Sequence, residues 1–407
     1  MDTPRANAMT DLSKENSKSI FLIIISFVAC LAGIASDIYA PSLPAISISL
    51  NASINLVQMS LAIFMLGLSI SQLIYGPLSD AFGRRPILML GLIITFVGTG
   101  ICYLSPNINS LILGRFVQGC GAGACAALWR STFRDVFLGA ELAKYGSYLS
   151  VCMVFVVPAA PAFGGFLQQS FGWRSSFLIL GLYLLVTLFL VAFLLKETSK
   201  HHHKSRFSKS FIISSYAELL KSRVFMGYSL CVFLTYGAFF SWFAVGPVLL
   251  INHLGHSPIT FGWISFAALG GSMAIGSFLN ARLIERFGIY AMLRFGWSMN
   301  FLAGALMLFT HWFMSLSTFT LVGPVVIFYL GATFIFANTF AGAFAKFGKI
   351  AGFTGALYGS FQIAGAWVLG SLVSYLPDNT QAPLGCVYVG CSSAAWLVYK
   401  KIVRPAE

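Results

Sequence analysis

The sequence predicts an all-α membrane protein of twelve transmembrane helices, arranged as two six-helix bundles. Of its 407 residues, 58% are hydrophobic and only 9% are charged, and the mean hydropathy is +0.84. Soluble domains average about 45–50% apolar residues and about a quarter charged residues. A bilayer span takes about 20 apolar residues, so roughly twelve spans and their short loops account for the whole length. The charges are also unevenly distributed along the chain.

The basic residues gather on one side of the expected spans. A net charge of +13 is compatible with nucleic-acid binding, because a basic surface attracts phosphates. Here, however, Arg174 alone falls on the opposite side and Arg115 alone falls inside a span. Lys and Arg concentrate in cytoplasmic loops of membrane proteins. The pattern therefore predicts an even number of spans, two cytoplasmic termini and no nucleic-acid partner.

Apolar runs separated by polar residues define the expected elements in chain order. The spans are expected at 20–46, 55–79, 86–105, 108–130, 142–168, 174–196, 224–252, 260–283, 290–312, 314–343, 351–375 and 384–402. The domains follow as a cytoplasmic tail (1–19), an N-terminal bundle (20–196), a cytoplasmic linker (197–223), a C-terminal bundle (224–402) and a second tail (403–407). The linker contains His201, His202 and His203. Three adjacent histidines are compatible with a metal patch, but a solvated linker is the preferred interpretation, and no metal site is predicted.

The two bundles resemble each other in sequence. The second span ends in Gly76-Pro-Leu-Ser-Asp80-Ala-Phe-Gly83-Arg84-Arg85, and the eighth ends in Gly276-Ser-Phe-Leu-Asn280-Ala-Arg282-Leu-Ile-Glu285-Arg286-Phe-Gly288. Parallel repeats of this kind describe the major facilitator architecture, in which the binding site lies near the bilayer midplane and access alternates by rocking.

The first of these segments also carries a specific motif. Gly76-x-Leu78-x-Asp80-x-x-Gly83-Arg84-Arg85-Pro86 matches, at each defining position, the loop signature of the major facilitator superfamily. The glycines allow a tight turn and close helix approach, and Pro86 suits a first helical position. The resemblance implies that contacts of Asp80 with Arg84 or Arg85 latch the cytoplasmic side. The alternative is that the two arginines only set the topology.

Three further segments are distinctive: Asp37-Ile-Tyr39-Ala-Pro41-Ser-Leu-Pro44, Gly114-Arg115-Phe-Val-Gln118-Gly119 and Ala351-Gly352-Phe-Thr-Gly355-Ala-Leu-Tyr358-Gly359-Ser-Phe-Gln362. Together they resemble one branch of that superfamily, the bicyclomycin-resistance and chloramphenicol-exporter (Bcr/CflA) group of drug:proton antiporters. The resemblance implies a proton-coupled exporter of drug-like or small amphipathic molecules in a bacterial inner membrane. A proton-coupled importer of a metabolite or siderophore is the alternative.

Asp37 is the only acidic residue inside an expected span. A carboxylate there costs several kcal/mol unless it is paired, protonated or in contact with water. It is therefore the candidate proton carrier, and the resemblance places the family's first-helix acid at this position. A buried carboxylate satisfied by its neighbours is the alternative.

Arg115 is the only cation inside an expected span, and it keeps its charge at accessible pH. It must therefore find acceptors or water within the bundle, and Asp37 is the only charged candidate in its half. Gln118 shares the face of Arg115 by its i, i+3 spacing. The hypothesis is that Asp37 and Arg115 couple proton and substrate. Snorkelling of Arg115 to the interface is the alternative.

The fifth span contains Ala160-Pro161-Ala-Phe-Gly164-Gly165, which resembles the antiporter signature except that its first Gly is Ala. Pro161 interrupts the hydrogen-bond ladder, and Gly164 and Gly165 permit close helix packing. The segment is interpreted as a pivot, with plain small-residue packing as the alternative. Candidate substrate-binding residues are Tyr39, Gln118, Tyr236, Trp242, Asn338, Tyr358 and Gln362.

The sequence offers no sign of an enzyme. Nucleophile-elbow, P-loop and HExxH motifs do not occur in it, so the expected driving force is electrochemical and no cofactor is predicted. The eight cysteines lie in apolar stretches without metal-ligand spacing and are interpreted as packing residues. The expected partners are a small-molecule substrate, protons and the lipid bilayer, and the protein is expected to be monomeric.

Overall fold

The structure is a computed structural model that describes residues 3–199, 209–347 and 350–406, and these residues form helices and loops without any strand. The first half contains α1 (Thr3–Asp37), η1 (Ala40–Ser42), α2 (Leu43–Ser49), α3 (Ile54–Phe82), α4 (Arg84–Tyr103), α5 (Ile108–Val136), α6 (Gly139–Phe171), α7 (Arg174–Phe189) and η2 (Leu190–Leu194). The second half contains α8 (Lys209–Lys221), α9 (Arg223–Pro247), η4 (Val248–His253), α10 (Pro258–Phe266), η5 (Ala267–Gly271), α11 (Ser272–Phe313), α12 (Thr318–Phe344), α13 (Ala351–Ser374), α14 (Ala382–Val398) and η7 (Tyr399–Val403).

The helices span a membrane as predicted. Within the described ranges, 11 helical segments are long and apolar enough to cross a bilayer. One of them, Pro258–Phe313, has 56 residues, which at 1.5 Å per residue would be about 84 Å against a hydrocarbon core of about 30 Å. Non-helical backbone at Gly288 divides it into two spans. The total of twelve confirms the predicted fold class, and the chain is a multi-pass membrane protein.

The sequence repeat is also a structural repeat. Gly83 joins α3 to α4 with φ 100° and ψ 157°, and Gly288 joins the two parts of α11 with φ 75° and ψ 169°. A positive φ is readily adopted by glycine and is strained for other residues. The two repeated segments therefore end in the same kind of tight turn.

The first expected span, 20–46, is not one continuous helix. The α-helix ends at Asp37, and η1 and α2 follow at a different pitch. Pro41 cannot donate a backbone hydrogen bond to the carbonyl of Asp37, and its ring would clash with that carbonyl in a regular helix. Likewise, Pro44 cannot donate a backbone hydrogen bond to the carbonyl of Ala40, and its ring would clash with that carbonyl in a regular helix. The predicted span is confirmed as the membrane-crossing segment Ser17–Ser49, with an interruption after Asp37 that hydropathy does not reveal.

The linker predicted at 197–223 contains a helix, α8, whose Leu219 is fully buried. Tyr216 of this helix donates a hydrogen bond to the carbonyl of Leu73 in α3, at 2.8 Å, and burial raises the pKa of its phenol. His201, His202 and His203 lie outside the described residues.

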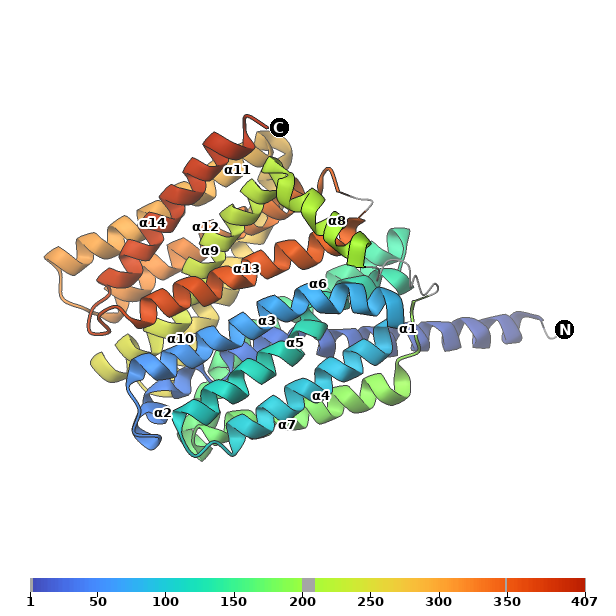
Figure 1. The fold of residues 1–407 in the computed structure, drawn as a ribbon, viewed down its shortest axis with the longest axis horizontal. Helices are drawn as coiled ribbons and strands as arrows, with labels where there is room; N and C mark the ends of the chain where they lie inside the picture. The colour runs from blue at the N-terminus through green and yellow to red at the C-terminus, as the bar shows by residue number, and fades with distance from the viewer. Residues whose placement is uncertain (1–2, 200–208, 348–349, 407) are drawn as a thin grey trace.

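The two halves lie side by side. In Figure 1, α3, α4, α5 and α7 lie in the lower part of the molecule and α9, α12, α13 and α14 lie in the upper part, with the N-terminus at the right and the C-terminus at the top. The halves meet where α3 packs against α13 and where α6 packs against α10. Large apolar side chains on the outside, such as Phe189 (58% exposed) and Phe193 (74% exposed), suit contact with lipid.

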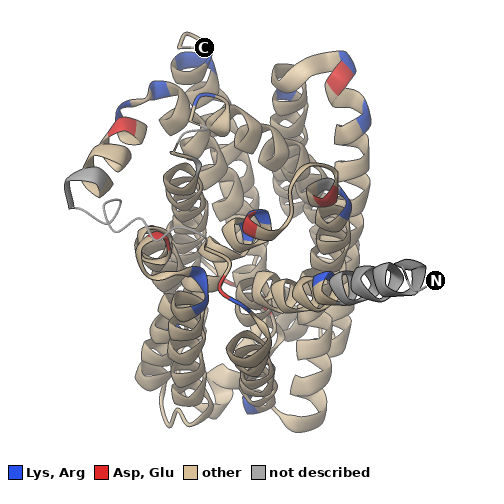
Figure 2. Ribbon diagram, turned by 90° about the vertical axis from the view of Figure 1, so that its right-hand side faces the viewer, with Lys and Arg blue, Asp and Glu red and all other residues tan. Residues whose placement is uncertain are grey.

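The two ends of the molecule differ in charge. Figure 2 looks onto the end that carries both termini, where Lys and Arg gather on the helix ends and loops. We call this the basic end, and we call the other the opposite end. At the opposite end, the Arg174 guanidinium holds the loop after α4 through the carbonyls of Tyr103 (3.1 Å) and Ser105 (2.8 Å).

Candidate functional site

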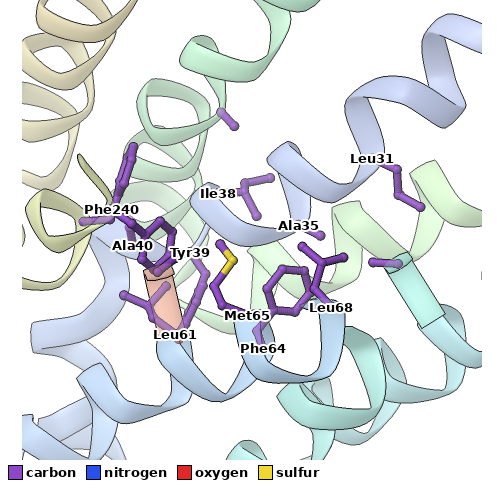
Figure 3. Packing of buried hydrophobic residues seen from close by; sticks show 14 of the residues in the cluster. Leu31, Ala35, Ile38, Tyr39, Ala40, Leu61, Phe64, Met65, Leu68 and Phe240 are labelled. Carbon is purple, nitrogen blue, oxygen red and sulfur yellow. The ribbon is translucent and has the colours of Figure 1, made fainter. Parts of the chain in front are cut away.

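Asp37 lies at the break in the first helix, within the membrane-spanning segment Ser17–Ser49. Its side chain is only 6% exposed, and the hydroxyl of Ser36 donates a hydrogen bond to its Oδ1. Figure 3 shows the broken segment passing from Ala35 to Ala40 against α3. Because Pro41 ends the helix here, the carboxyl group projects from an irregular stretch of backbone inside the bundle.

Aromatic side chains of the second half gather on α9 and α12, and Tyr236 of α9 and Tyr329 of α12 are two of them. These two rings pack around Phe239, with ring centroids 5.6 Å and 4.5 Å from it, and Phe336 lies 5.7 Å from Phe239. We call Tyr236, Phe239, Tyr329 and Phe336 the aromatic cluster. The segment that follows Asp37, η1, packs against α9 and α10. The break after Asp37 therefore lies where the first half contacts α9, which carries two members of this cluster.

Arg115 is held beside Asp37 without pairing with it. Within the part of the chain that the structure describes, no ion pair joins the two side chains. Instead, Nη1 of Arg115 donates to the carbonyl of Ala35, at 2.8 Å, and to Oε1 of Gln118, at 2.5 Å. Gln118 in turn donates to the hydroxyl of Thr99, at 2.8 Å. Arg115 thus acts on the backbone two residues before Asp37, and because it is 0% exposed it does not snorkel.

Two aromatic rings enclose the Arg115 guanidinium. Its central carbon lies 4.4 Å from the ring centroid of Tyr39 and 4.2 Å from that of Phe64, a distance at which cation–π attraction is effective. The Tyr39 hydroxyl is paired with that of Ser60, at 2.6 Å. Tyr39, predicted as a substrate-binding residue, is fully buried within the first half and supports Arg115.

The other candidate substrate-binding residues are spread over the second half. Trp242 is fully buried and donates to Ser265, at 3.1 Å. Asn338 donates to Oδ1 of Asn280, at 2.8 Å. The Tyr358 hydroxyl is paired with that of Thr339, at 2.8 Å, and Gln362 is half-buried on α13. Of the seven candidates, Tyr236 is the one that the structure brings into the aromatic cluster. Tyr329, Phe239 and Phe336 were not among the candidates. Aromatic residues make up 15% of the chain, so a single aromatic residue does not stand out from its neighbours in the sequence.

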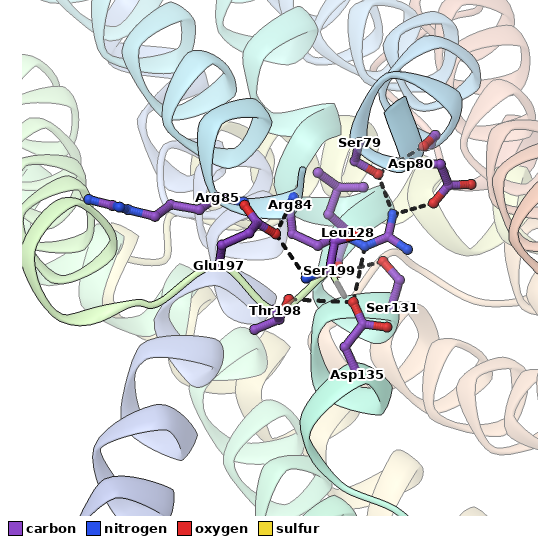
Figure 4. A network of polar contacts seen from close by, with 11 residues as sticks. Ser79, Asp80, Arg84, Arg85, Leu128, Ser131, Asp135, Glu197, Thr198 and Ser199 are labelled. Carbon is purple, nitrogen blue, oxygen red and sulfur yellow. Dashed lines mark hydrogen bonds and ion pairs between the residues drawn. The ribbon is translucent and has the colours of Figure 1, made fainter. Parts of the chain in front are cut away.

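The predicted gating loop forms a network at the basic end, drawn in Figure 4. Nη1 of Arg84 lies 2.6 Å from Oδ1 of Asp80, and its Nε lies 3.2 Å from Oδ2 of Asp135. Nη2 of Arg85 donates to the carbonyl of Ala192, at 2.5 Å. Gly83 makes the turn, and Gly76 lies against Ala356 of α13. The expected contact between Asp80 and Arg84 is therefore present, and Asp135 is an additional member.

Glu197 completes this network and was not anticipated. Its two carboxylate oxygens accept hydrogen bonds from the backbone N–H groups of Arg84, at 2.9 Å, and Arg85, at 3.1 Å. These donors are free at the start of α4 and carry partial positive charge. The hydroxyl of Thr198 contacts Asp135, at 3.4 Å. The sequence shows that an acidic residue directly follows the sixth expected span. It does not show that the chain after this span folds back so that Glu197 reaches the start of α4.

The glycines of α6 lie at close helix contacts. A Cβ on Gly164 would lie 1.7 Å from the carbonyl oxygen of Ile38, and one on Gly165 would lie 2.2 Å from that of Pro258 in α10. A Cβ on Gly262 would in turn lie 2.5 Å from the carbonyl oxygen of Pro161. This segment joins α6 both to the break in α1 and to the second half.

A separate cavity of about 650 Å³ opens at the basic end of the first half. It is lined by Ser17, Lys18, Ile20, Phe21, Ile24, Asp135, Val136, Leu194, Leu195, Lys196, Glu197 and Thr198. Within the described residues, no group of three or more His, Cys, Asp and Glu side chains is placed to hold a metal ion.

Comparison with known proteins agrees with this geometry. A family model described as the Major Facilitator Superfamily matches residues 25–370. A bicyclomycin resistance protein homolog of Haemophilus influenzae is 27% identical over 95% of this chain and 97% of its own length. Multidrug resistance protein D of Escherichia coli is 28% identical over 92% and 93%. The solved structure of a D-xylose–proton symporter superposes with a TM-score of 0.71 at 15% identity, covering 95% of this chain and 98% of its own.

Proposed function

Because the chain belongs to the major facilitator superfamily and is thus a transporter of small molecules rather than an enzyme, we propose that it exports drug-like or small amphipathic molecules across a bacterial inner membrane in exchange for protons. Two relatives that match nearly its whole length carry drug resistance in their names. Their resemblance supports export, and the burial of Asp37 between apolar helices supports its role as the group for which a proton and a substrate compete.

The observation that carries the proposal is the position of Asp37. Among the described residues, Asp37 and Arg115 are the only charged side chains that are buried. Arg115 is fixed within the first half, whereas Asp37 directly precedes the segment η1, which packs against α9 and α10 of the second half. A carboxyl group between two bundles can be exposed to either side of the membrane as the bundles rock. It can therefore take up a proton on one side and release it on the other.

The contacts between the halves suggest how access alternates. At the opposite end, α6 packs tightly on α10 through Gly165 and Gly262, and Nε2 of Gln58 in α3 donates to the carbonyl of Ala244 in α9, at 2.9 Å. Separating these contacts would open the site to that end. The protein would then alternate between a state open to the basic end and a state open to the opposite end. We propose that protonation of Asp37 favours one of these states and that substrate binding favours the other.

The available energy suits uphill export. One proton crossing 100 mV supplies about 2.3 kcal/mol, and a difference of one pH unit supplies about 1.4 kcal/mol. Together they support accumulation ratios of up to a few hundredfold for one proton exchanged.

The test replaces Asp37 by Asn, which keeps the size and loses the titration. We expect Asp37→Asn to abolish substrate accumulation in vesicles that carry an imposed pH gradient, while energy-independent exchange of substrate across the membrane persists. Asp378→Asn is the matched control, because Asp378 lies in the loop between α13 and α14 and should leave accumulation unchanged. Uphill accumulation by Asp37→Asn would contradict the proposal.

The same assay separates export from import. In vesicles with an acidic interior, which reproduce an inverted bacterial membrane, an exporter that exchanges substrate for protons accumulates substrate inside. An importer that moves both in the same direction instead loses substrate from them. Accumulation in vesicles of the reverse gradient would favour the importer of a metabolite or siderophore.

A further inference from the structure

The linker helix α8 is held by the second half of the protein. Its Leu219 is 0% exposed and packs in a cluster with Phe225 of α9 and Phe353 of α13. The ring of Tyr216 also lies edge to face against Phe353, with ring centroids 5.2 Å apart. The body of α8 therefore belongs to the second half, although in the sequence it follows the last span of the first half.

The hydroxyl of Tyr216 reaches across to the first half. It donates a hydrogen bond to the carbonyl of Leu73 in α3, at 2.8 Å. In a regular helix this carbonyl accepts from the N–H group four residues later, but that residue is Pro77, which has no N–H group. Pro77 therefore leaves an acceptor on α3, and Tyr216 supplies its donor. One turn earlier, the carbonyl of Ser69 accepts from the hydroxyl of Ser360 in α13, at 2.8 Å.

The surroundings make this hydrogen bond a link between the halves at the basic end. A Cβ on Gly76 of α3 would lie 3.6 Å from that of Ala356 in α13, so the two helices are closely packed here. The ion pairs of Arg84, by contrast, lie within the first half. A motion that separates α3 from α13 at this end would leave both the Tyr216 hydroxyl and the Leu73 carbonyl without their partner.

We propose that Tyr216 is a positioning residue of the transport cycle, whose hydroxyl holds the two halves together at the basic end until that end opens. The second half carries the donor, and the first half carries the acceptor that Pro77 exposes. Helices bend most readily at proline, so the link lies where the basic end of α3 can move. This inference rests on the proposed function in taking the two halves to rock against each other, but it involves neither the proton nor the substrate.

The experiment measures distances between the halves in the full chain, without substrate. Leu138 in the first half, Phe287 in the second half and Leu220 in α8 are exposed. Spin labels are attached through Leu138→Cys combined with either Phe287→Cys or Leu220→Cys, and Cys386→Ser removes the exposed native cysteine. Tyr216→Phe keeps the ring and removes only the donor. We expect double electron–electron resonance to show about a two- to tenfold larger population of long distances between Leu138 and Phe287, as the loss of one hydrogen bond implies.

Tyr183→Phe is the matched control. Tyr183 is likewise half-buried and donates to a main-chain carbonyl, that of Phe27, at 2.8 Å, but both residues lie in the first half. The control variant should therefore keep the wild-type distances. An unchanged distribution in Tyr216→Phe, or an equal shift in both variants, would overturn the inference. A shift seen only between Leu138 and Leu220 would also overturn it, because α8 would then have loosened while the halves kept their spacing.

A second variant tests whether the Leu73 carbonyl is the acceptor that matters. Pro77→Ala restores an N–H group to α3, so this carbonyl keeps a partner when the tyrosine hydroxyl is removed. In the Pro77→Ala background we expect Tyr216→Phe to change the distances less than in the wild-type background, since the acceptor is no longer left unpaired. An equal change in the two backgrounds would rule out the link through Leu73.

The distances are measured without any gradient, so this outcome stays distinct from failure of the proposed function. If Asp37→Asn still accumulates substrate, the proposed function fails, whatever the distances in Tyr216→Phe. If Asp37→Asn loses accumulation and Tyr216→Phe matches Tyr183→Phe in its distances, only the role of Tyr216 fails.

Discussion

At the scale of single residues, Arg115 shows how a permanent charge is kept inside a membrane protein. The guanidinium lies over the rings of Tyr39 and Phe64 and donates to two oxygens. Contact of a planar cation with aromatic rings and directed donors at its edge are properties of arginine, because the lysine ammonium is compact and strongly hydrated. We infer that the position requires arginine and not merely a positive charge.

Arg115→Lys tests this requirement. We expect the free energy of unfolding to fall by about 2–3 kcal/mol, because the ammonium loses both the stacking and one of the buried hydrogen bonds. Transport should fall as well, since the backbone before Asp37 loses its anchor. Thermal unfolding of the purified protein in detergent measures the first effect.

Arg174→Lys is the control, because Arg174 also stacks on a ring, that of Trp173 at 4.1 Å, and binds two carbonyls, but it lies at the opposite end of the bundle. Arg174→Lys should lower the free energy of unfolding by less than about 1 kcal/mol. Equal losses in the two variants would contradict the role assigned to burial.

The sequence revealed those site residues that differ chemically from their surroundings. Asp37 and Arg115 are charges in apolar runs, so their positions could be predicted. The packing of Tyr329 against Phe239 could not be predicted, because one tyrosine among many aromatic residues carries no such contrast. Glu197 could be seen, but its partners are backbone groups more than a hundred positions earlier, and side-chain chemistry alone does not identify them.

At the scale of elements, the close contact between α6 and α1 positions the site. Gly164 lets the backbone of α6 approach Ile38, the residue after Asp37, so closely that no side chain fits between them. The prolines that end α1 are visible in the sequence. The hydropathy pattern nevertheless merges the two helical pieces, because apolar residues continue through the break. The boundaries of such an element depend on a contact with another helix, which hydropathy does not report.

Gly164→Ala is expected to disturb both packing and transport. The added methyl group would overlap backbone atoms, which cannot rotate away, so α6 must shift from α1. Overpacking of this kind costs typically 1–3 kcal/mol, and we expect transport to fall on the order of tenfold or more as Asp37 moves. Unfolding and transport measured in the same preparation give both values.

Gly181→Ala is the matched control, because a Cβ on Gly181 has Phe96 as its nearest neighbour, at 3.9 Å, an ordinary contact distance. This variant should keep wild-type stability and transport. Normal transport by Gly164→Ala would show that the approach of α6 to α1 does not position the site.

At the scale of the whole molecule, the two halves are joined by few polar contacts. Ser360 of α13 donates to the carbonyl of Ser69 in α3, at 2.8 Å, and Gln58 of α3 donates to Ala244 of α9 at the opposite end. Gln58 is only 3% exposed. Opening of this end would break the hydrogen bond between Gln58 and Ala244 and leave a buried group without its partner. The bond therefore stabilises the closed state at this end.

Gln58→Ala should shift the balance toward opening. The loss of one buried hydrogen bond, about 0.5–1.5 kcal/mol, corresponds to roughly a two- to tenfold larger open population. Leu104 in the first half and Phe319 in the second are exposed, so spin labels can be attached through Leu104→Cys and Phe319→Cys. Cys386→Ser removes the exposed native cysteine from this background. We expect double electron–electron resonance to show a larger share of long distances.

Ser47→Ala is the control, because the Ser47 hydroxyl donates to the carbonyl of Ala52 within the first half, at 2.7 Å. It should leave the distances unchanged. A distance distribution in Gln58→Ala identical to that of the control would rule out Gln58 as a latch between the halves.

The fold as a whole was predictable because the bilayer imposes it. Spans of sufficient length, one-sided charge and a repeated loop restrict the chain to paired bundles. The approach of α6 to α10 was not predictable, because it depends on glycines whose partners lie in the other half.

The capping of α4 by Glu197 has a consequence for biosynthesis. The partners that Figure 4 labels in this network lie between Ser79 and Ser199, so none of them has to wait for translation of the second half. As the sixth span leaves the ribosome, the residue that follows it can close the network on the finished half. The nascent first bundle can therefore assemble as a unit while the remaining helices are still being inserted, in keeping with the sequential folding of large chains.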